Sequence, residues 1–231
     1  MKDRSSTARS VVLVVLGVCL GLWLSGCSSA TPESAGNSPT TSEPDSPLKT
    51  DIREALDATK ALNSVHLTMR TNGQVDSLLG ITGADVDMRA KPLAAKGDCT
   101  YQGQSGVPFR VKDDNISVKL FDDWTNLGNV TDLSATRLID PINGVTKLLG
   151  GVTNLQPQGT EVIDGINTNK TSATLPVDSV KQLDPGARSS RPATVWIAND
   201  GSHRLVRASV DLGGGTVQVQ LSKWNEPVNV D

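Results

Sequence analysis

Side chains able to do chemistry are scarce in this chain. Its 231 residues include two histidines and three cysteines. His66 and His203 both stand on the polar side of segments that alternate like strands, so we expect solvated rings and no general base. The sequence contains no G-x-S-x-G, H-E-x-x-H, C-x-x-C, P-loop or G-x-G-x-x-G motif. We therefore expect no catalytic residue, no cofactor and no metal site, and a protein that is not an enzyme.

The remaining reactive groups have ordinary structural explanations. The acid pairs Asp113-Asp114 and Asp122-Asp123 follow strand-like segments, where aspartate is a favourable turn residue. Cys99 lies on the apolar side of a predicted strand with no histidine near it in sequence, which indicates a small buried hydrophobic residue. The net charge of −3 lacks the basic excess typical of nucleic-acid binders, so we expect no nucleic-acid partner.

The first 26 residues have the pattern of a signal peptide. A basic segment precedes Val11–Leu24, an uncharged run of 14 residues. A membrane-spanning helix needs about 20 apolar residues, so this run suits a signal sequence better. It ends in Leu24-Ser25-Gly26-Cys27, which looks like a bacterial lipobox. We predict cleavage before Cys27, lipid on its thiol, and export to the envelope side of the cell membrane; the alternative is an ordinary secretory signal with a chance cysteine.

A spacer is expected between this lipid anchor and the folded domain. Residues 27–47 comprise Cys27 followed by SSATPESAGNSPTTSEPDSP, which has no basic residue and no apolar side chain larger than alanine. Such a composition buries too little to offset the entropy of ordering, and it predicts a disordered linker. The domain then covers 48–231 and contains Cys99 alone among the cysteines, so no internal disulfide is expected.

Hydrophobic periodicity predicts an α+β domain made mainly of antiparallel strands. A helix is expected from near Leu48 to about Asn63, and further helices over Leu133–Ile139, Pro141–Leu149 and Pro176–Leu183. Ten strands follow from alternation: 65–69, 86–90, 95–101, 107–111, 116–120, 158–163, 166–175, 193–198, 203–212 and 216–224. Tight turns between consecutive strands favour an antiparallel meander.

The apolar side of these strands is rich in Val, Ala, Gly and Thr, and aromatic residues make up 3% of the chain. A curved sheet lined by small aliphatic side chains and covered by helices can enclose a hollow. The alternative is that Val and Leu fill the interior completely. Periodicity alone favours the filled interior over the hollow one.

Long segments of the whole chain resemble the mycobacterial lipoprotein family of LppX, LprG, LprA and LprF, its LppX branch above all. The segments that carry the resemblance are LWLSGCSS, LDATKALNSVH, VDSLLGIT, ADVDMRAKPLAAKG, VPFRVKDDNISVKLFDDWTNLG, GVTNLQPQGTEVIDG, RPATVWIANDGSHRLVRASVDLGGG and SKWNEPVNVD. The resemblance implies a U-shaped antiparallel half-barrel, similar to LolA and LolB, with helices over its concave face and a large apolar cavity.

With this architecture the apolar strand sides and one helix face become the cavity wall. The expected wall residues are Val86, Met88, Ala95, Gly97, Cys99, Tyr101, Phe109, Val111, Val118, Leu120, Val145, Leu148 and Leu149. The resemblance implies a non-enzymatic carrier that moves phthiocerol dimycocerosate-type wax or a related glycolipid across the periplasm to the outer membrane. An inner-membrane lipid exporter is then an expected partner. The alternative is a surface lipoprotein that acts as an adhesin or protein-interaction module.

The lipobox is tested by Cys27→Ala. Removing the only thiol at the predicted acylation point should leave the precursor uncleaved or release the protein, because a stable anchor requires at least two acyl chains. The measurement is partitioning between detergent and water, with wild type as the reference. Full retention of the variant in the detergent phase would show that Cys27 is not the anchor.

Overall fold

The structure is a computed structural model, and it describes residues 46–75, 78, 80–130, 140 and 144–230. The predicted signal peptide, Cys27, nearly all of the predicted linker, the predicted helix Leu133–Ile139 and the start of the one expected at Pro141 lie outside these residues.

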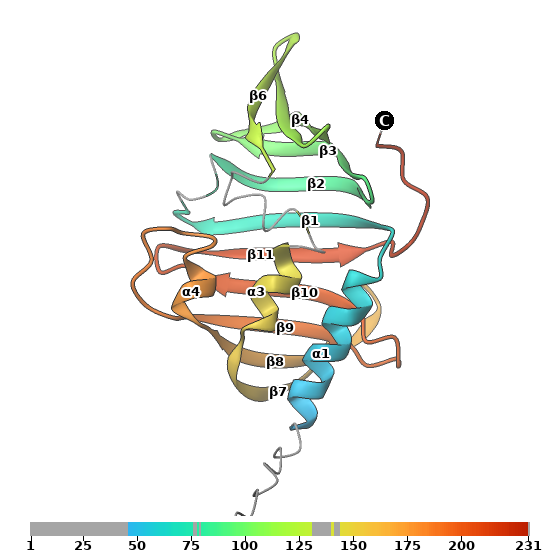
Figure 1. Cartoon of the computed structure of the whole chain (residues 1–231), viewed down its shortest axis with the longest axis vertical. Coiled ribbons are helices and arrows are strands. Elements are labelled where there is room, and N and C mark those ends of the chain that lie inside the picture. Colours follow the sequence, from blue (N-terminus) through green and yellow to red (C-terminus); the bar gives the residue numbers. More distant parts are fainter. Residues whose placement is uncertain (1–45, 76–77, 79, 131–139, 141–143, 231) are drawn as a thin grey trace, which may run out of the picture. The chain divides into compact units, whose positions relative to one another are not determined.

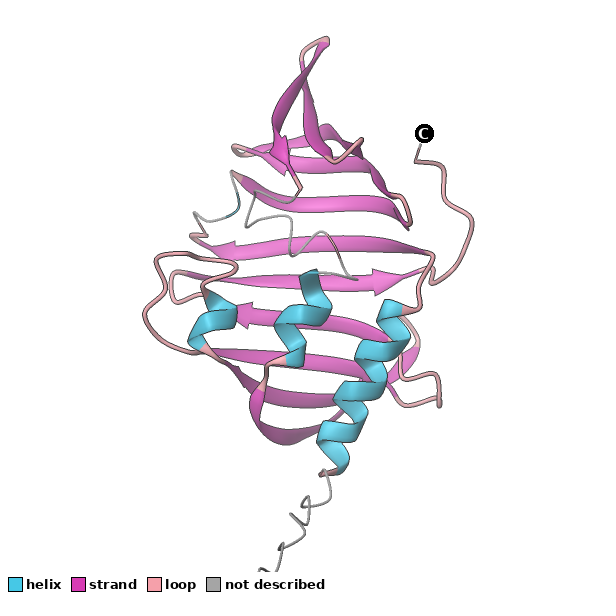
Figure 2. Ribbon diagram, viewed as in Figure 1, coloured by secondary structure: helices cyan, strands magenta, loops and turns pink. Residues whose placement is uncertain are grey.

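The described residues form one antiparallel sheet of eleven strands (Figures 1 and 2). In chain order the strands are β1 Ser64–Gly73, β2 Ile81–Ala90, β3 Leu93–Tyr101, β4 Gln104–Lys112, β5 Asn115–Leu120, β6 Asp123–Asn129, β7 Thr153–Ile163, β8 Ile166–Leu175, β9 Arg191–Ala198, β10 Leu205–Asp211 and β11 Gly215–Ser222. Their order across the sheet is β6-β5-β4-β3-β2-β1-β11-β10-β9-β8-β7. The strands therefore form two meanders, which join where β1 pairs with β11. β6 and β7 are the two edges, so the sheet is open.

Cross-strand register puts the apolar side chains of the sheet on one face, because directly paired residues of antiparallel strands point the same way. Leu67 of β1 lies opposite Val86 of β2 and Leu221 of β11. Val86 lies opposite Gly97 of β3, and Gly97 lies opposite Phe109 of β4. The apolar residues on this face belong to one buried cluster that reaches from β5 to β8. We call this side the inner face.

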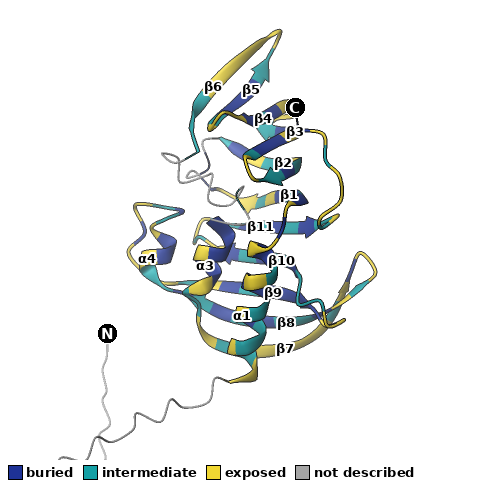
Figure 3. Cartoon of the chain, turned by 45° about the vertical axis from the view of Figure 1, so that its right-hand side comes forward, coloured by how far each residue is buried: buried dark blue, intermediate teal, exposed yellow. Residues whose placement is uncertain are grey.

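Three α-helices of the described chain cover part of the inner face: α1 Pro47–Lys60, α3 Thr146–Gly150 and α4 Val177–Val180. The helix α1 packs against β7, β9 and β10, and α3 lies between α1 and α4 (Figures 1 and 3). Ile52, Ala55, Leu56 and Thr59 of α1 are buried, at the spacing of one helix face. The helices thus lie over the β7–β11 half of the sheet.

Most predicted elements are confirmed, with shifted ends. The helix expected from Leu48 begins at Pro47 and ends at Lys60, which is earlier than Asn63. The helix expected over Pro176–Leu183 is shorter, because only Val177–Val180 is α-helical. The strand expected to begin at Gln158 begins at Thr153 instead.

The prediction missed one strand, the edge strand β6. Its sequence DWTNLGN does not alternate, and its residues are exposed or half-buried, so the pattern of a half-buried strand is lacking. Its pairing with β5 is what makes it a strand, with Leu120 opposite Asp123.

On the opposite, outer face, a polar network links the strands from β7 to β11. The carboxylate of Glu161 accepts hydrogen bonds from Trp196 Nε1 at 2.9 Å and from Lys170 Nζ at 3.2 Å. Arg207 Nη1 lies 3.5 Å from its other oxygen and also donates to Gln220 of β11. The hydrogen bonds from Trp196 and Lys170 hold the pKa of Glu161 below its usual value. Side chains from five strands are thereby tied together on the side away from the helices.

Close approach of β2 and β3 requires a glycine at position 97. A Cβ there would collide with the carbonyl oxygen of Asp85 and lie 2.7 Å from Cα of Val86. We expect Gly97→Ala to lower the free energy of unfolding by about 1–3 kcal/mol, as overpacking typically does. Urea denaturation measures the change.

The matched control is Gly150→Ala, where a Cβ would meet only Leu56 Cδ1, at 3.7 Å. It should be neutral or slightly stabilising, since alanine is the better helix former. Equal stability of the Gly97 and Gly150 variants would show that β2 and β3 can separate to accept a side chain.

Candidate functional site

A groove of about 340 Å³ lies where α1, the end of α3 and the start of β7 meet. Its apolar lining residues are Ile52, Leu56, Leu149, Val152 and Leu155. Its polar lining comes from Lys49, Arg53, Asp57 and Lys60 of α1. The arrangement is an apolar trough beside a mostly basic helix side, which suits an amphiphile with an apolar chain and an anionic or polar head.

Helix geometry explains how α1 supplies both kinds of lining. Ile52 and Leu56 are four residues apart and therefore stand one above the other on the helix. Lys49, Arg53 and Lys60 occupy the neighbouring side, and Lys60 Nζ lies 3.3 Å from Asp57 Oδ1. This exposed pair contributes little to stability, so it leaves the edge of the groove adaptable.

The size of the groove limits what it holds without rearrangement. Its volume is at the low end of the ~300–1,000 Å³ typical of small-molecule pockets. One chain of a lipid suits this space, whereas a lipid with several long chains needs more of the inner face. Access to the part of that face under α1, α3 and α4 requires these helices to shift.

The short helices α3 and α4 would not be stable on their own. α3 has five residues and α4 has four, far below the ~12–15 residues at which isolated helices become even marginal. None of α1, α3 and α4 has a side-chain hydrogen bond at its N-cap. Their stability therefore comes from packing on the inner face, and anything that replaces this packing can displace them.

The structure places the predicted wall residues on the inner face or in its cover. Those on the strands are Val86, Met88, Ala95, Gly97, Cys99, Tyr101, Phe109, Val111, Val118 and Leu120, and those in the helical cover are Val145, Leu148 and Leu149. Gly97, Tyr101 and Leu120 are half-buried and the others are buried. Only Leu149 of the thirteen lines the groove. Contact of the thirteen wall residues with lipid remains a prediction. Sequence reasoning missed the other residues of the groove because they come from three separate elements, α1, α3 and β7.

Cys99 is buried, as its strand position predicts, with 3% of its surface exposed. Burial, with a smaller effect from the charge of Asp98, raises the pKa of its thiol to about 11. A thiol that stays protonated at neutral pH is a poor nucleophile, which fits a structural role.

The two histidines have more partners than the sequence indicated. His66 is held between Asp87, 2.8 Å from Nδ1, and Asp85, 3.2 Å from Nε2, and its side chain is only 18% exposed. His203 lies in the turn before β10, not on a strand, and its Nδ1 is 3.2 Å from Oε2 of Glu54 on α1. Alternation could not reveal these partners because they come from other elements.

Comparison with known proteins identifies the family of this open sheet and its covering helices. Residues 47–230 match the LppX_LprAFG lipoprotein family. The chain belongs to this family. A Mycobacterium tuberculosis protein named as a candidate phthiocerol dimycocerosate transporter, LppX, is 65% identical to the chain over the full length of both. The lipoarabinomannan carrier protein LprG of M. tuberculosis is 31% identical and covers 98% of the chain, with 96% of LprG aligned.

The fold of the family is also seen by crystallography. The crystal structure of M. tuberculosis LppX superposes with a TM-score of 0.73 at 68% identity, covering 80% of this chain and 98% of the other. The predicted open antiparallel architecture is therefore confirmed. Among the described residues, no helix has the length and apolar character needed to cross a membrane.

The buried thiol gives a test of the inner-face assignment. Iodoacetamide should label Cys99 at pH 8 at least 100-fold more slowly in the native protein than in urea, because only a small fraction is thiolate at a pKa of about 11. Peptide mapping by mass spectrometry measures the rate. The unfolded thiol ionises near 9.0, so stability should fall as the pH rises from about 9 to 11. Equal labelling in both states would place Cys99 in solvent.

Proposed function

We propose that this protein is a lipid carrier of the cell envelope, anchored to the membrane through lipid on Cys27, and that it is not an enzyme. The observation that carries the proposal is a continuous apolar inner face on an open sheet, covered by short helices with a groove at their junction. The names of two relatives support it, since LppX is named as a candidate phthiocerol dimycocerosate transporter and LprG as a lipoarabinomannan carrier.

The physical need for such a carrier follows from the cost of hydrating lipid chains. Each methylene group exposed to water costs about 0.8 kcal/mol, so a lipid with dozens of them cannot cross an aqueous compartment unaided. An apolar face offers the same environment as the membrane. Binding and release then require no chemical step.

We infer that entry of cargo begins at the groove and proceeds by displacement of the helical cover. A first chain inserts between Leu56 of α1, Leu149 of α3 and Leu155 of β7. Further chains replace the helices on the inner face, where lipid contacts compensate for lost helix contacts. The nearly equal exchange of apolar surface keeps the process reversible, as a carrier requires.

The proposed cargo is a phthiocerol dimycocerosate-type wax or a related glycolipid. Identity of 65% with LppX against 31% with LprG favours the wax over lipoarabinomannan. The proposed route runs from an inner-membrane exporter across the periplasm to the outer membrane. The lysines and arginine beside the groove would face the polar part of the cargo or the headgroups at either membrane.

An exposed aromatic tip supports the second candidate, a protein-interaction module. Phe121, in the turn between β5 and β6, is fully exposed, and Trp124 is 39% exposed with the guanidinium of Arg110 at 4.0 Å from its ring centroid. Aromatic and arginine side chains are enriched in protein interfaces. This surface would serve a carrier as a contact with its exporter, or an adhesin as its binding site.

Native mass spectrometry separates the two candidates. The intact protein, purified from a lipid-producing mycobacterial host, should carry a lipid adduct that organic extraction removes and identifies. Protein purified without lipid, from a host that makes the wax in abundance, would overturn the carrier proposal.

A charge placed in the groove should reduce lipid binding specifically. Leu155→Asp puts a carboxylate on the groove lining at a half-buried position, so it should lower bound lipid several-fold with a change in melting temperature of only a few degrees. Bound lipid per protein and a thermal melt are the two measurements.

Val162→Asp is the matched control, because it introduces the same carboxylate on the same strand at a position that is 63% exposed. It should retain its lipid. Equal lipid loads in both variants would show that the groove is not the entry site.

A further inference from the structure

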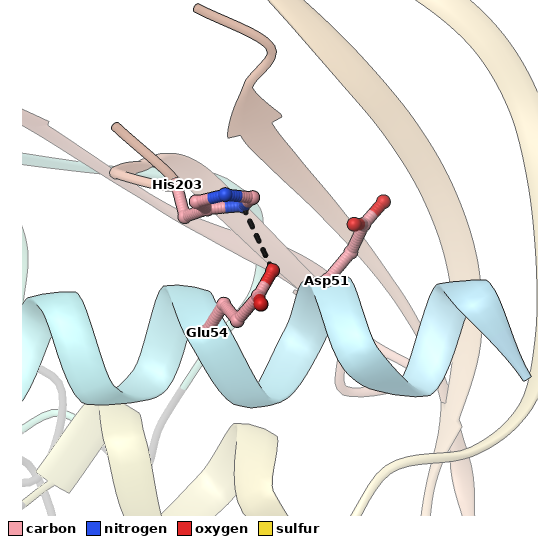
Figure 4. A group of neighbouring side chains, drawn as sticks. All are labelled: Asp51, Glu54 and His203. Atoms are coloured by element: carbon pink, nitrogen blue, oxygen red, sulfur yellow. Dashed lines mark ion pairs between the residues drawn. The ribbon is translucent and has the colours of Figure 1, made fainter. Parts of the chain in front are cut away.

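A group of three metal-ligating side chains joins α1 to the turn between β9 and β10. Asp51 and Glu54 are three residues apart and therefore share one side of α1. His203 faces them from the turn, with Nδ1 3.2 Å from Oε2 of Glu54. One ligand atom from each residue lies within 4.8 Å of the other two (Figure 4).

The turn that carries His203 is braced by its own hydrogen bonds. Asp200 accepts from the backbone N–H of Ser202 at 3.0 Å and from Arg204 Nη2 at 2.9 Å. Arg204 also stacks over the ring of Trp224, 4.6 Å from its centroid. The imidazole is thus presented to α1 from an ordered turn.

Interaction with the helix dipole does not account for the position of Asp51 and Glu54 on α1. Acidic residues stabilise a helix through its dipole when they lie in the first turn, and the first turn of α1 contains none. The two carboxylates lie close enough to repel each other. A bound dication would turn this repulsion into coordination.

The donor set fits a borderline transition metal. Zinc binds histidine nitrogen at ~2.0–2.1 Å and carboxylate oxygen at ~2.0–2.2 Å, so neighbouring ligand atoms around it stand roughly 3–3.5 Å apart. The distance from His203 to Glu54 is already in this range. Their side chains are 39% and 44% exposed, which leaves the group open to ions from solution.

The geometry points to a divalent-metal site of the zinc class, with Asp51, Glu54 and His203 as ligands and water completing the coordination. Occupation of the site would tie α1 to the β9–β10 turn. Since α1 is also a wall of the groove, the metal would hold one part of the helical cover against the sheet. Metal binding itself does not depend on the proposed lipid function.

A second histidine, also beside two carboxylates, provides a control of different geometry. His66 is also flanked by two aspartates, but Asp87 lies at Nδ1 and Asp85 at Nε2, on opposite edges of the ring. A single ion cannot sit on both edges, so the ring and both carboxylates cannot coordinate it together. This group should not form a three-ligand site.

The test is titration of the purified, metal-stripped full chain in detergent with Zn²⁺ and with Co²⁺. Calorimetry should show one saturable Zn²⁺ site, and Co²⁺ should develop visible absorption that Zn²⁺ abolishes. His203→Ala and the isosteric Glu54→Gln and Asp51→Asn should each weaken binding at least 10-fold, whereas His66→Ala should leave it unchanged. If Zn²⁺ does not bind one-to-one, or if the three variants do not weaken its binding, the metal-site proposal is wrong. The group is then only an ion pair between His203 and Glu54.

Hydrogen exchange tests the tie between α1 and the turn. Saturating Zn²⁺ should slow exchange of the amides in Pro47–Lys60 in the wild type, and it should have no effect in Glu54→Gln. Zinc binding that leaves this exchange unchanged would overturn the tie, whatever lipid the protein carries.

Discussion

The pairing of β1 with both β2 and β11 is the constraint on which the rest of the structure depends. It joins the first strand of the chain to the last and turns two separate meanders into one sheet. Its register sets Leu67 between Val86 and Leu221, so the apolar sides of both meanders coincide. A slip of one residue at this junction would put the apolar side of one meander on the face opposite that of the other. The single inner face, and with it any lipid site, exists because of this register.

An open sheet with one apolar face must be covered, and the kind of cover decides what the protein can do. Long, capped helices would make a permanent core, whereas α3 and α4 are too short to persist without the sheet. The polar ties of the sheet, centred on Glu161, are on the outer face, where they hold β7 to β11 together independently of the helices. At the edge, Pro157 and the register shifts of β7 interrupt its ladder and discourage pairing with other chains. The sheet is therefore held together by polar contacts on its outer face, while part of its inner face packs against helices.

Local sequence patterns predicted most of the elements. Alternation located ten of the eleven strands, because an antiparallel strand with one buried face carries period-two hydrophobicity. The missed strand β6 is an edge strand with no buried side, so its residues carry no such signal. Cys99 was placed correctly on the buried side by the same alternation. The half-barrel topology itself came from resemblance to a family, since alternation does not say which strands are neighbours.

The sequence by itself determined ten of the eleven described strands, the first helix and the sides of those strands that become buried, because these depend on residues a few positions apart. Only the tertiary structure decided that β1 lies beside β11, that β6 and β7 are edges, and that the groove forms from α1, α3 and β7. It also decided that His203 meets Glu54 and that His66 lies between two aspartates. These meetings join elements that are remote in the chain. They follow from strand register and helix packing, which depend on many contacts at once. No local sequence pattern therefore predicts them.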